Sequence, residues 1–343
     1  MMNIVILDGY TANPGDLSWD ALKNFGELTV YERTYASDTL ERAKDADIVL
    51  TNKVILGKAE IEQLPRLKYI GVLATGYNVV DTKAARAHGI DVCNIPAYST
   101  NSVAQMVFAH ILNVTQHVDH YAQANRQGAW ARSIDFSWQD TPLVELEEKT
   151  LGIVGLGNIG KAVARIGHAF GMKILAETSK ASSALPDYIQ KVTRTELFEQ
   201  ADFLSLHCPL TDSTHHIICK ESIEKMKPSV VVINTGRGPL VNESDMAEAL
   251  HTNRIHAYCA DVLCNEPPAA NNPLLACTNA FITPHIAWAT REARERLVNI
   301  AIDNVKCFVE GHAQNGVNYV TIKNNGMLMK QCYRGLIEAY LGI

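Results

Sequence analysis

The second half of the chain carries three side chains whose chemistry fits together. Arg237, Glu266 and His285 each follow an apolar run of strand-like composition. Arginine binds a carboxylate through two donors in a fixed fork, and histidine titrates close enough to neutrality to exchange a proton with an alcohol oxygen. A carboxylate beside the imidazole would hold its orientation and favour its protonated form. Together the three side chains suit the reduction of a 2-keto acid by hydride.

Each of these side chains has a structural alternative when it is taken singly. Arg237 could form a surface salt bridge, Glu266 could be a solvated loop acid, and His285 could cap a helix or lie in the core. Their shared position favours catalysis, because the carboxyl ends of parallel strands meet at one edge of a sheet. The three preceding runs are V-V-V-I-N at 230–234, A-Y-C-A-D-V at 257–262 and A-F-I-T at 280–283.

A glycine-rich turn upstream of these runs predicts a dinucleotide site. The motif G-L-G-N-I-G at 155–160 follows an apolar run that begins at Leu151, and a helical pattern continues from it to Gly171. The first glycine permits a sharp turn, the second lets the backbone approach a pyrophosphate, and the third lets the helix pack close to the sheet. A second apolar run ends at Glu177, about 20 residues beyond the glycines. A turn that serves packing alone is the alternative.

Further strand and helix patterns complete a central α/β domain around this turn. Another strand is expected at 202–207, and Thr193 with Glu196 predicts a capping box at a helix start. A first α/β domain precedes it, because short apolar runs alternate with helical stretches from Asn3 onward. Its expected strands are 4–7, 28–31, 47–50, 69–74 and 90–94, and its expected helices are 16–25, one opening at Asp38 with a capping box to Glu41, 58–63 and 82–88.

Three segments outside these two patterns carry separate expectations. Residues 101–123 form one long helical pattern that is apolar around much of its circumference, which favours burial at a subunit interface, burial between domains being the alternative. A helix at 290–311 should return the chain to the first domain. Residues 315–343 form an extra tail with a modest helical pattern from Met327 to Leu341.

Composition excludes several classes of protein. The net charge of −6 is mild, so no nucleic-acid footprint is expected, and no apolar run is long enough to span a membrane. The eight cysteines form no C-x-x-C pair and no Cys/His cluster, which predicts thiols in a reducing compartment, with no metal site. Because no leader pattern opens the sequence, a cytoplasmic protein is expected.

At the level of motifs the chain resembles the D-isomer-specific 2-hydroxyacid dehydrogenases, from Asn3 to about Val317. The segments that carry the resemblance are L-A-T-G-Y-N-V-V-D at 73–81, N-I-P-A-Y-S-T-N-S-V-A-Q at 94–105, G-L-G-N-I-G, L-H-C-P-L-T at 206–211, I-N-T-G-R-G-P-L-V at 233–241 and T-P-H-I-A-W at 283–288. Within the family, L-D-G-Y-T-A-N-P-G-D-L-S-W at 7–19 and Trp288 resemble the glycerate dehydrogenase, or hydroxypyruvate reductase, branch.

The resemblance implies an α/β architecture of two doubly wound parallel-sheet domains. A Rossmann NAD(P)-binding domain at 102–287 would be inserted in a discontinuous, flavodoxin-like substrate domain formed by 1–101 and 288–320. Residues 321–343 would form the C-terminal tail. A homodimer is expected as well.

Roles for individual residues follow from the same resemblance. Arg237 would hold the substrate carboxylate and carbonyl, His285 would be the general acid/base, and Glu266 would pair with it. Thr75 and Gly76 would bind the carboxylate through backbone amides, an ordinary turn being the alternative, and Trp288 would shape the substrate pocket or only pack. Asp261 would accept a hydrogen bond from the nicotinamide carboxamide, or only cap a turn. The implied cofactor contacts are Gly155, Gly157, Asn158, Ile159, Gly160, Glu177, Thr178, Pro209, Thr214, Thr235 and Asp261.

The choice between NAD and NADP stays open at the end of the second strand. Thr178 occupies the place where relatives usually carry a ribose-binding aspartate, and Glu177 stands one place early. If Glu177 reaches the ribose, its carboxylate favours NAD and repels a 2′-phosphate. If it does not, Thr178, Ser179 and Lys180 can bind that phosphate, and NADP becomes a realistic cofactor.

The function that these observations favour is NAD(P)-dependent reduction of hydroxypyruvate and glyoxylate to D-glycerate and glycolate. The alternative within the class is a dehydrogenase of another D-2-hydroxy acid, with pyruvate, a branched-chain keto acid or 3-phosphohydroxypyruvate as the keto substrate. The alternative from a different class is a binding module that senses NAD(H). The intact Arg237, Glu266 and His285 favour an enzyme over that module.

Overall fold

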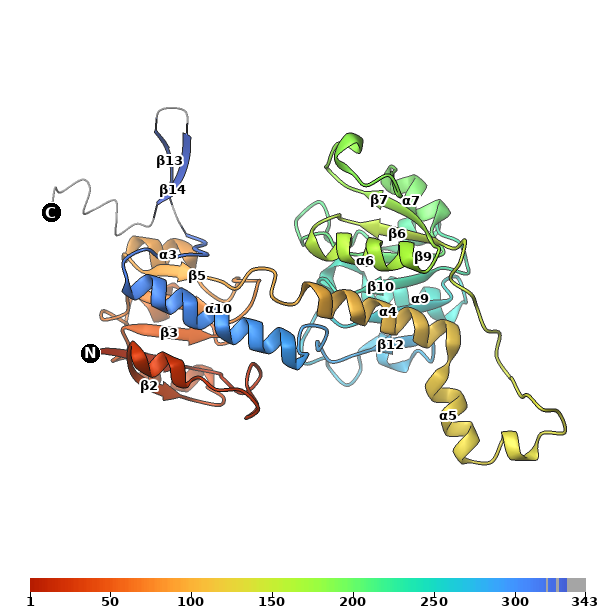
Figure 1. Cartoon of the computed structure of the whole chain (residues 1–343), viewed down its shortest axis with the longest axis horizontal. Helices are drawn as coiled ribbons and strands as arrows, with labels where there is room; N and C mark the ends of the chain where they lie inside the picture. The colour runs from red at the N-terminus through yellow and green to blue at the C-terminus, as the bar shows by residue number, and fades with distance from the viewer. Residues whose placement is uncertain (319, 325–326, 332–343) are drawn as a thin grey trace. The chain divides into compact units, whose positions relative to one another are not determined.

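The computed structural model describes residues 1–318, 320–324 and 327–331, and the chain divides into two compact units. Unit 1 comprises residues 1–98 and 289–343, and unit 2 comprises residues 99–288. Each unit is built on its own parallel sheet with helices on its faces (Figure 1). The expected α/β class with two parallel-sheet domains is therefore confirmed. No helix in the described part of the chain has both the length and the hydropathy needed to cross a membrane.

The sheet of unit 1 has five parallel strands in the order β2-β1-β3-β4-β5. Buried aliphatic side chains from both of its faces form the core, as expected for a sheet covered on two sides. Helix α10 packs against β4, where the rings of Tyr69 and Phe308 lie 4.8 Å apart. The elements of unit 1 are β1 Met2–Ile6, η1 Asp20–Asn24, β2 Gly26–Val30, η2 Ala36–Asp38, α1 Thr39–Ala43, β3 Ile48–Thr51, α2 Lys58–Ile61, β4 Tyr69–Val72, α3 Thr82–Ala87, β5 Asp91–Cys93, α10 Arg291–Val309, β13 Val320–Asn324 and β14 Met327–Gln331.

The sheet of unit 2 has seven parallel strands in the order β12-β11-β10-β9-β6-β7-β8. Helices α4 and α6 pack together on one face, and α7, α8 and α9 contribute to the core of the other. The strands are β6 Thr150–Val154, β7 Lys173–Glu177, β8 Ile189–Lys191, β9 Phe203–Leu206, β10 Val231–Asn234, β11 Ala257–Ala260 and β12 Ala280–Ile282. The helices are α4 Thr100–Gln116, α5 Val118–Arg126, η3 Trp130–Arg132, α6 Asn158–Ala169, η4 Ser182–Ala184, α7 Arg194–Gln200, α8 Lys220–Ile223, η5 Gly238–Leu240, α9 Glu243–His251 and η6 Pro273–Ala276.

The single helix expected over residues 101–123 is wrong. His117 takes a positive φ of 49° and separates α4 from α5. The buried apolar stripe of α4 packs within unit 2 against α6 and the sheet, whereas α5 buries none of its side chains. Figure 1 shows α5 and the segment after it reaching away from the rest of unit 2. Without packing on α5, nothing holds the two helices on one axis.

Two other local expectations also fail, and one strand was missed. Residues 16–19 are not helical, because the side chain of Asn13 accepts hydrogen bonds from the amides of Gly15 and Leu17 and holds a loop there. Asp38 caps no helix, since its backbone is already helical after the turn η2. The strand β8 was not expected at all.

The helix expected in the tail is wrong where the structure describes it, whereas the capping box expected at Thr193 is confirmed. Residues 327–331 form β14, which pairs antiparallel with β13, so the helix expected from Met327 is wrong over this span, and its remainder lies outside the described residues. In the capping box of α7, the Thr193 hydroxyl accepts from the Glu196 amide and the Glu196 carboxylate accepts from the Thr193 amide, as predicted.

Candidate active site at the carboxyl ends of the unit 2 strands

An imidazole and a carboxylate lie in direct contact beyond β11 and β12. His285 Nδ1 and Glu266 Oε2 are 2.6 Å apart, and both side chains are about one-third exposed. Glu266 Oε1 also accepts from the Leu263 amide at 3.1 Å, which holds the carboxylate in place. The other imidazole nitrogen, Nε2, has no hydrogen-bond partner among the described residues. One nitrogen is therefore oriented while the other is available to a substrate.

The backbone that presents His285 is in a conformation that needs support. Its φ of 54° is left-handed, which costs a β-carbon residue about 1–3 kcal/mol. The carboxylate of Asp261, at the end of β11, provides the support from below. One oxygen accepts from the Thr283 hydroxyl at 2.6 Å and the Ile286 amide at 2.9 Å, and the other accepts from the Ala287 amide at 2.8 Å.

Asp261 is almost fully enclosed by these contacts, with a relative exposure of 1%. Its three hydrogen bonds all go to the loop that carries His285, so the carboxylate positions the imidazole. The expected contact of Asp261 with a nicotinamide carboxamide stays a prediction.

Helix α4 adds a second support for the same loop, which the sequence analysis did not anticipate. His110 Nε2 lies 3.4 Å from the Thr283 hydroxyl, and the Ser102 hydroxyl donates to the Ala287 carbonyl at 2.6 Å. Burial lowers the pKa of His110, and the charge of Asp261 opposes that effect. The sequence did contain a signal for these two contacts: Ser102 and His110 are polar residues within the apolar stripe of a helix, and buried polar groups need hydrogen-bond partners.

The loop after β10 brings Arg237 to the same edge of the sheet. The buried side chain of Asn234 accepts from the Gly236 amide and donates to the Arg237 carbonyl, which fixes the turn. A β-carbon at Gly238 would collide with the Leu263 carbonyl, so this loop passes directly beside the one that leads to Glu266. The Arg237 guanidinium is exposed and donates to the Gly236 carbonyl at 2.7 Å. It forms no ion pair with any described residue.

A neighbouring carboxylate fixes the β11 loop from behind. Glu243, the first residue of α9, accepts from the Cys264 amide at 2.7 Å and from the Asn272 side chain at 2.8 Å. Burial together with Glu243 raises the pKa of the Cys264 thiol to about 11, so this thiol stays protonated at neutral pH.

The glycine turn between β6 and α6 has the shape of a phosphate cradle. A β-carbon at Gly155, where φ is 92°, would lie 2.7 Å from the Cys208 amide nitrogen, and one at Gly160 would collide with the Gly155 carbonyl. Gly157 is different, because its φ of −77° suits any residue and a β-carbon there would meet no protein atom within 4 Å. Protein packing thus explains the first and third glycines, whereas the second faces open space. The amides of the first turn, from Asn158 and Ile159 onward, lack helical acceptors.

Two further predicted cofactor contacts occupy the adjoining loops. Thr235, after β10, has a buried hydroxyl with no partner among the described residues, which is the state expected of a group that meets a ligand. The Thr214 hydroxyl instead donates to the Pro209 carbonyl at 2.7 Å and accepts from the Thr211 amide at 2.8 Å. Thr214 therefore shapes the loop that carries the exposed Pro209.

The end of β7 presents its side chains to different partners. Glu177 Oε1 lies 3.2 Å from a guanidinium nitrogen of Arg194 on α7. The Thr178 hydroxyl accepts from the Lys180 amide at 3.3 Å, and Lys180 Nζ donates to the Leu156 carbonyl in the glycine turn at 2.7 Å. The structure thus brings the glycine turn and the segment after β7 together.

The two predicted carboxylate-binding residues belong to unit 1. Thr75 and Gly76 follow β4, and their backbone amides donate to no other described residue. The Thr75 hydroxyl donates to the Ile95 carbonyl and the Asn94 side chain donates to the Thr75 carbonyl, so the loop is held while its amides stay available. Trp288 is the last residue of unit 2 and is half-buried.

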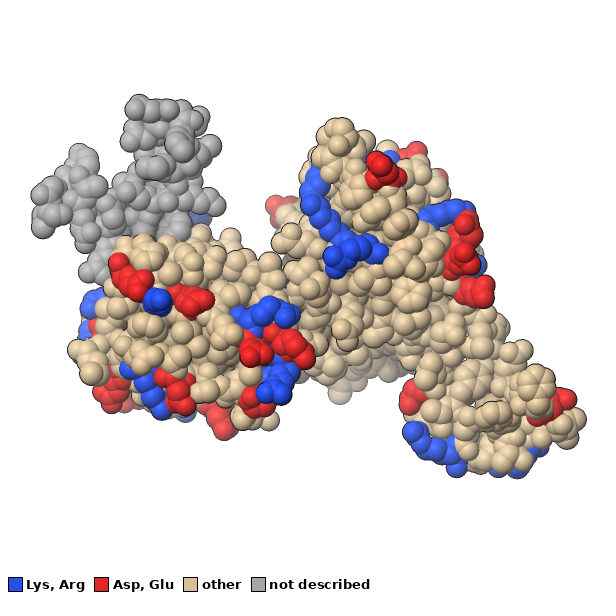
Figure 2. Space-filling view, viewed as in Figure 1, with Lys and Arg blue, Asp and Glu red and all other residues tan. Residues whose placement is uncertain are grey.

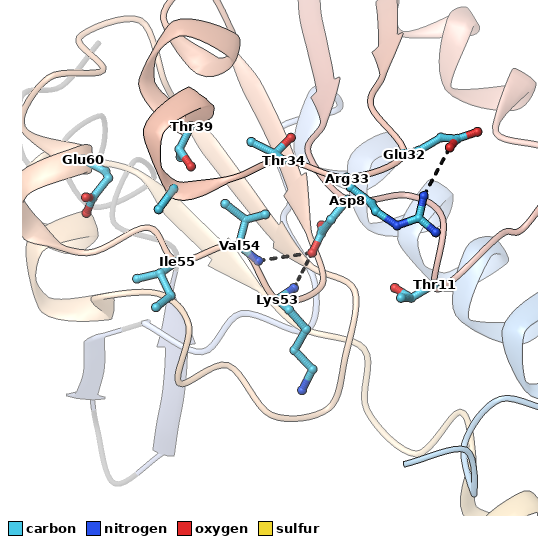
Figure 3. A pocket seen from close by; sticks show the side chains of 11 residues that line it. Asp8, Thr11, Glu32, Arg33, Thr34, Thr39, Lys53, Val54, Ile55 and Glu60 are labelled. Carbon is cyan, nitrogen blue, oxygen red and sulfur yellow. Dashed lines mark hydrogen bonds and ion pairs between the residues drawn. The ribbon is translucent and has the colours of Figure 1, made fainter. Parts of the chain in front are cut away.

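A separate pocket of about 560 Å³ lies at the carboxyl edge of β1 and β3 in unit 1 (Figure 3). Asp8 ties its floor, because its carboxylate accepts from the amides of Asn52, Lys53 and Val54. The rim carries both acidic and basic side chains, including Glu32 with Arg33. None of the predicted site residues lines this pocket.

Comparison with known proteins identifies the family to which the chain belongs. Residues 108–287 match the NAD-binding domain of the D-isomer specific 2-hydroxyacid dehydrogenases. The chain belongs to this family. Its dinucleotide-binding domain is therefore an NAD-binding domain by descent, and the chain is an oxidoreductase of the D-2-hydroxyacid dehydrogenase type.

Individual members of the family agree over nearly the whole chain. A hydroxypyruvate reductase of Blautia hydrogenotrophica is 44% identical over 92% of this chain and all of its own length. A glycerate dehydrogenase of Methylorubrum extorquens is 39% identical over 85% of this chain and 92% of its own. The structure of D-lactate dehydrogenase from Aquifex aeolicus, complexed with NAD and lactic acid, matches with a TM-score of 0.78 at 31% identity, covering 90% of this chain and 96% of that one.

Proposed function

We propose that this dehydrogenase reduces hydroxypyruvate, and glyoxylate, to the corresponding 2-hydroxy acids, D-glycerate and glycolate. The observation that carries the proposal is the His285–Glu266 pair, with Nδ1 held at 2.6 Å and Nε2 available, at the carboxyl edge of the same sheet that carries the glycine turn. The similarity to a hydroxypyruvate reductase and a glycerate dehydrogenase supports this choice of keto acid.

The glycine turn, the amides of the first turn of α6 and the Thr235 hydroxyl are the groups that would hold the cofactor. When bound, the nicotinamide ring supplies a hydride for the keto carbon. A β-carbon at Gly157 would project into the space left for the pyrophosphate, which is why the residues present fit this group.

The protein side of the reaction is a proton transfer and the binding of an anion. His285, protonated, would give the proton on Nε2 to the carbonyl oxygen as that oxygen gains charge, while Glu266 at Nδ1 stabilises the imidazolium. Arg237, which has no carboxylate partner within the described residues, would bind the substrate carboxylate and polarise the carbonyl. The binding of a carboxylate by the backbone amides of Thr75 and Gly76, which belong to unit 1, stays a prediction. In the opposite direction His285 would accept the proton of the hydroxyl group.

Initial rates of hydroxypyruvate reduction test this proposal, with NADH and NADPH supplied separately and pyruvate as the control substrate. Fast turnover of hydroxypyruvate is expected. The variant His285→Ala should lose about 10²–10⁴ in kcat, while its affinity for the reduced cofactor stays near that of the wild type. Activity on pyruvate alone would overturn the substrate and keep the mechanism, and unchanged turnover in His285→Ala would overturn the mechanism.

We also propose that the protein is a homodimer that acts in the cytoplasm. We place this interface on the segment after α4 rather than on the helix expected at 101–123. The reason is that α4 is packed within unit 2, whereas the segment after it exposes apolar side chains. Val118, Trp130, Ile134, Phe136 and Leu143 are all exposed, and Ile134 and Phe136 are more than 90% so. A second copy of the chain would cover them. Light scattering should show a dimer for the wild type and a monomer for the double variant Ile134→Asp/Phe136→Asp; a monomeric wild type would contradict the proposal.

The scattered cysteines support the proposed location in a reducing compartment, which cell fractionation would test.

A further inference from the structure

Two lysine side chains lie beside the glycine turn, and neither has an acidic partner among the described residues. Lys161 lies in the first turns of α6, and Lys180 follows β7 and donates through Nζ to the Leu156 carbonyl at 2.7 Å. The nearby ammonium of Lys161 lowers the pKa of Lys180, and burial lowers it further. Neither lysine forms an ion pair with any described residue. Figure 2 shows basic side chains gathered over α6 and the segment that adjoins it. Two adjacent like charges are unfavourable until an anion joins them.

The one carboxylate at the end of β7 is turned away from this pair. Side chains alternate between the faces of a strand, and Leu175 belongs to the core on the α7 side whereas Ile174 and Ala176 belong to the core on the α6 side. Glu177 shares the face of Leu175, and there it lies 3.2 Å from Arg194. Lys161 is on the α6 side. Glu177 is thus engaged by a cation on the opposite face of the sheet and does not neutralise the lysines.

We infer that Lys161 and Lys180 form a phosphate site that reads the 2′-phosphate of NADP, so that this chain prefers NADP over NAD. The inference rests on the proposed function only in taking the glycine turn as the dinucleotide site. The Thr178 hydroxyl, in the place where NAD-dependent relatives would carry an acid, adds no negative charge that would repel the phosphate. The same two ammonium groups could instead meet the pyrophosphate that NAD and NADP share, so the test separates these two sources of phosphate.

Equilibrium binding provides that test without any need for turnover. NADPH and NADH are titrated by quenching of tryptophan fluorescence, and adenosine 2′,5′-bisphosphate and 5′-AMP are titrated by calorimetry. The wild type should bind NADPH, and the bisphosphate, at least about tenfold more tightly than the partner that lacks the 2′-phosphate, as one charged hydrogen bond allows. Lys180→Ala should remove about tenfold of the affinity for NADPH and change that for NADH less than twofold.

A matched control is available on the same strand. Lys173, at the amino end of β7, pairs with Glu148, and Lys173→Ala removes the same charge far along the strand from the turn. It should leave all four affinities unchanged. Equal losses for NADPH and NADH in Lys180→Ala would assign the lysines to the pyrophosphate and overturn the inference, as would equal wild-type affinities.

The outcome also separates this inference from the proposed function. Tighter binding of the 2′-phosphate compounds without turnover of any keto acid would keep the inference and overturn the function. Turnover of hydroxypyruvate with equal use of NADH and NADPH would do the reverse.

Discussion

Replacing Asp261 by Asn tests whether the Asp261 carboxylate holds the loop that carries His285 in its observed position. The carboxylate accepts from the Thr283 hydroxyl and the Ile286 amide through one oxygen and from the Ala287 amide through the other. An amide side chain keeps one acceptor oxygen and places an NH₂ group opposite a donor at the other position. At least one of the three hydrogen bonds must therefore be lost, and a buried donor is left without a partner.

The magnitude follows from the contacts. A hydrogen bond to a charged group contributes about 1.5–3 kcal/mol, and the left-handed backbone of His285 stores about 1–3 kcal/mol that the same contacts restrain. A loss of about 2–3 kcal/mol would allow the loop to relax away from the position in which His285 meets Glu266. Since about 1.4 kcal/mol is a factor of ten, kcat should fall by about 30- to 150-fold.

The assay measures kcat and KM for hydroxypyruvate over a range of pH, together with the affinity for the reduced cofactor and the free energy of unfolding. Asp202→Asn is the matched control, because Asp202 also accepts from a backbone amide, that of Thr150, at the amino edge of the same sheet. It should lose stability while retaining kcat. An Asp261→Asn kcat within twofold of the wild type would refute the reasoning. So would a raised Kd for the cofactor with kcat preserved at saturation, which would favour a direct contact with the nicotinamide.

Two further predictions concern the glycine turn and the imidazole of His207. Gly157→Ala should weaken NADH and NADPH binding by about tenfold or more if the proposed site at the glycine turn is right. It should leave the unfolding free energy unchanged or raised by about 0.4–1 kcal/mol, because the added methyl meets no protein atom within 4 Å. Gly160→Ala would strike the Gly155 carbonyl and should unfold more easily. Fluorescence titration and urea denaturation measure both, and unchanged binding in Gly157→Ala would contradict the assignment. Burial lowers the pKa of His207 to about 4, so the unfolded chain binds this proton first and the unfolding free energy should fall by up to about 3 kcal/mol as the pH drops from about 6.5 to 4. Urea denaturation at several pH values should show a shallower decline in His207→Gln, and an identical slope would count against it.

The break between α4 and α5 at His117 shows where hydrophobic periodicity predicts the wrong helix boundary. The apolar pattern of residues 101–123 is continuous in sequence, yet the buried positions end with α4 and the chain turns at a left-handed residue. Periodicity reports which face could be buried, but the partner that buries it lies elsewhere in the chain or in another copy. The same limit applies to Asp38, whose capping role was lost to a preceding helical turn.

Local chemistry determined much of this protein in advance. The glycine turn, the parallel strands and the capping box at Thr193 follow from residue types at short spacing, because turns, caps and strand patterns depend on neighbours in the sequence. The tertiary structure alone decided the contacts between residues that are far apart in the sequence. It shows that Asp261 supports the loop of His285 and that His110 and Ser102 support it from α4. It also shows that Glu177 lies against Arg194 and that Lys180 lies near Lys161. The physical reason is that a side chain's electrostatic partners come from whichever elements the fold brings to its side of the sheet, and spacing along the chain carries no record of that side.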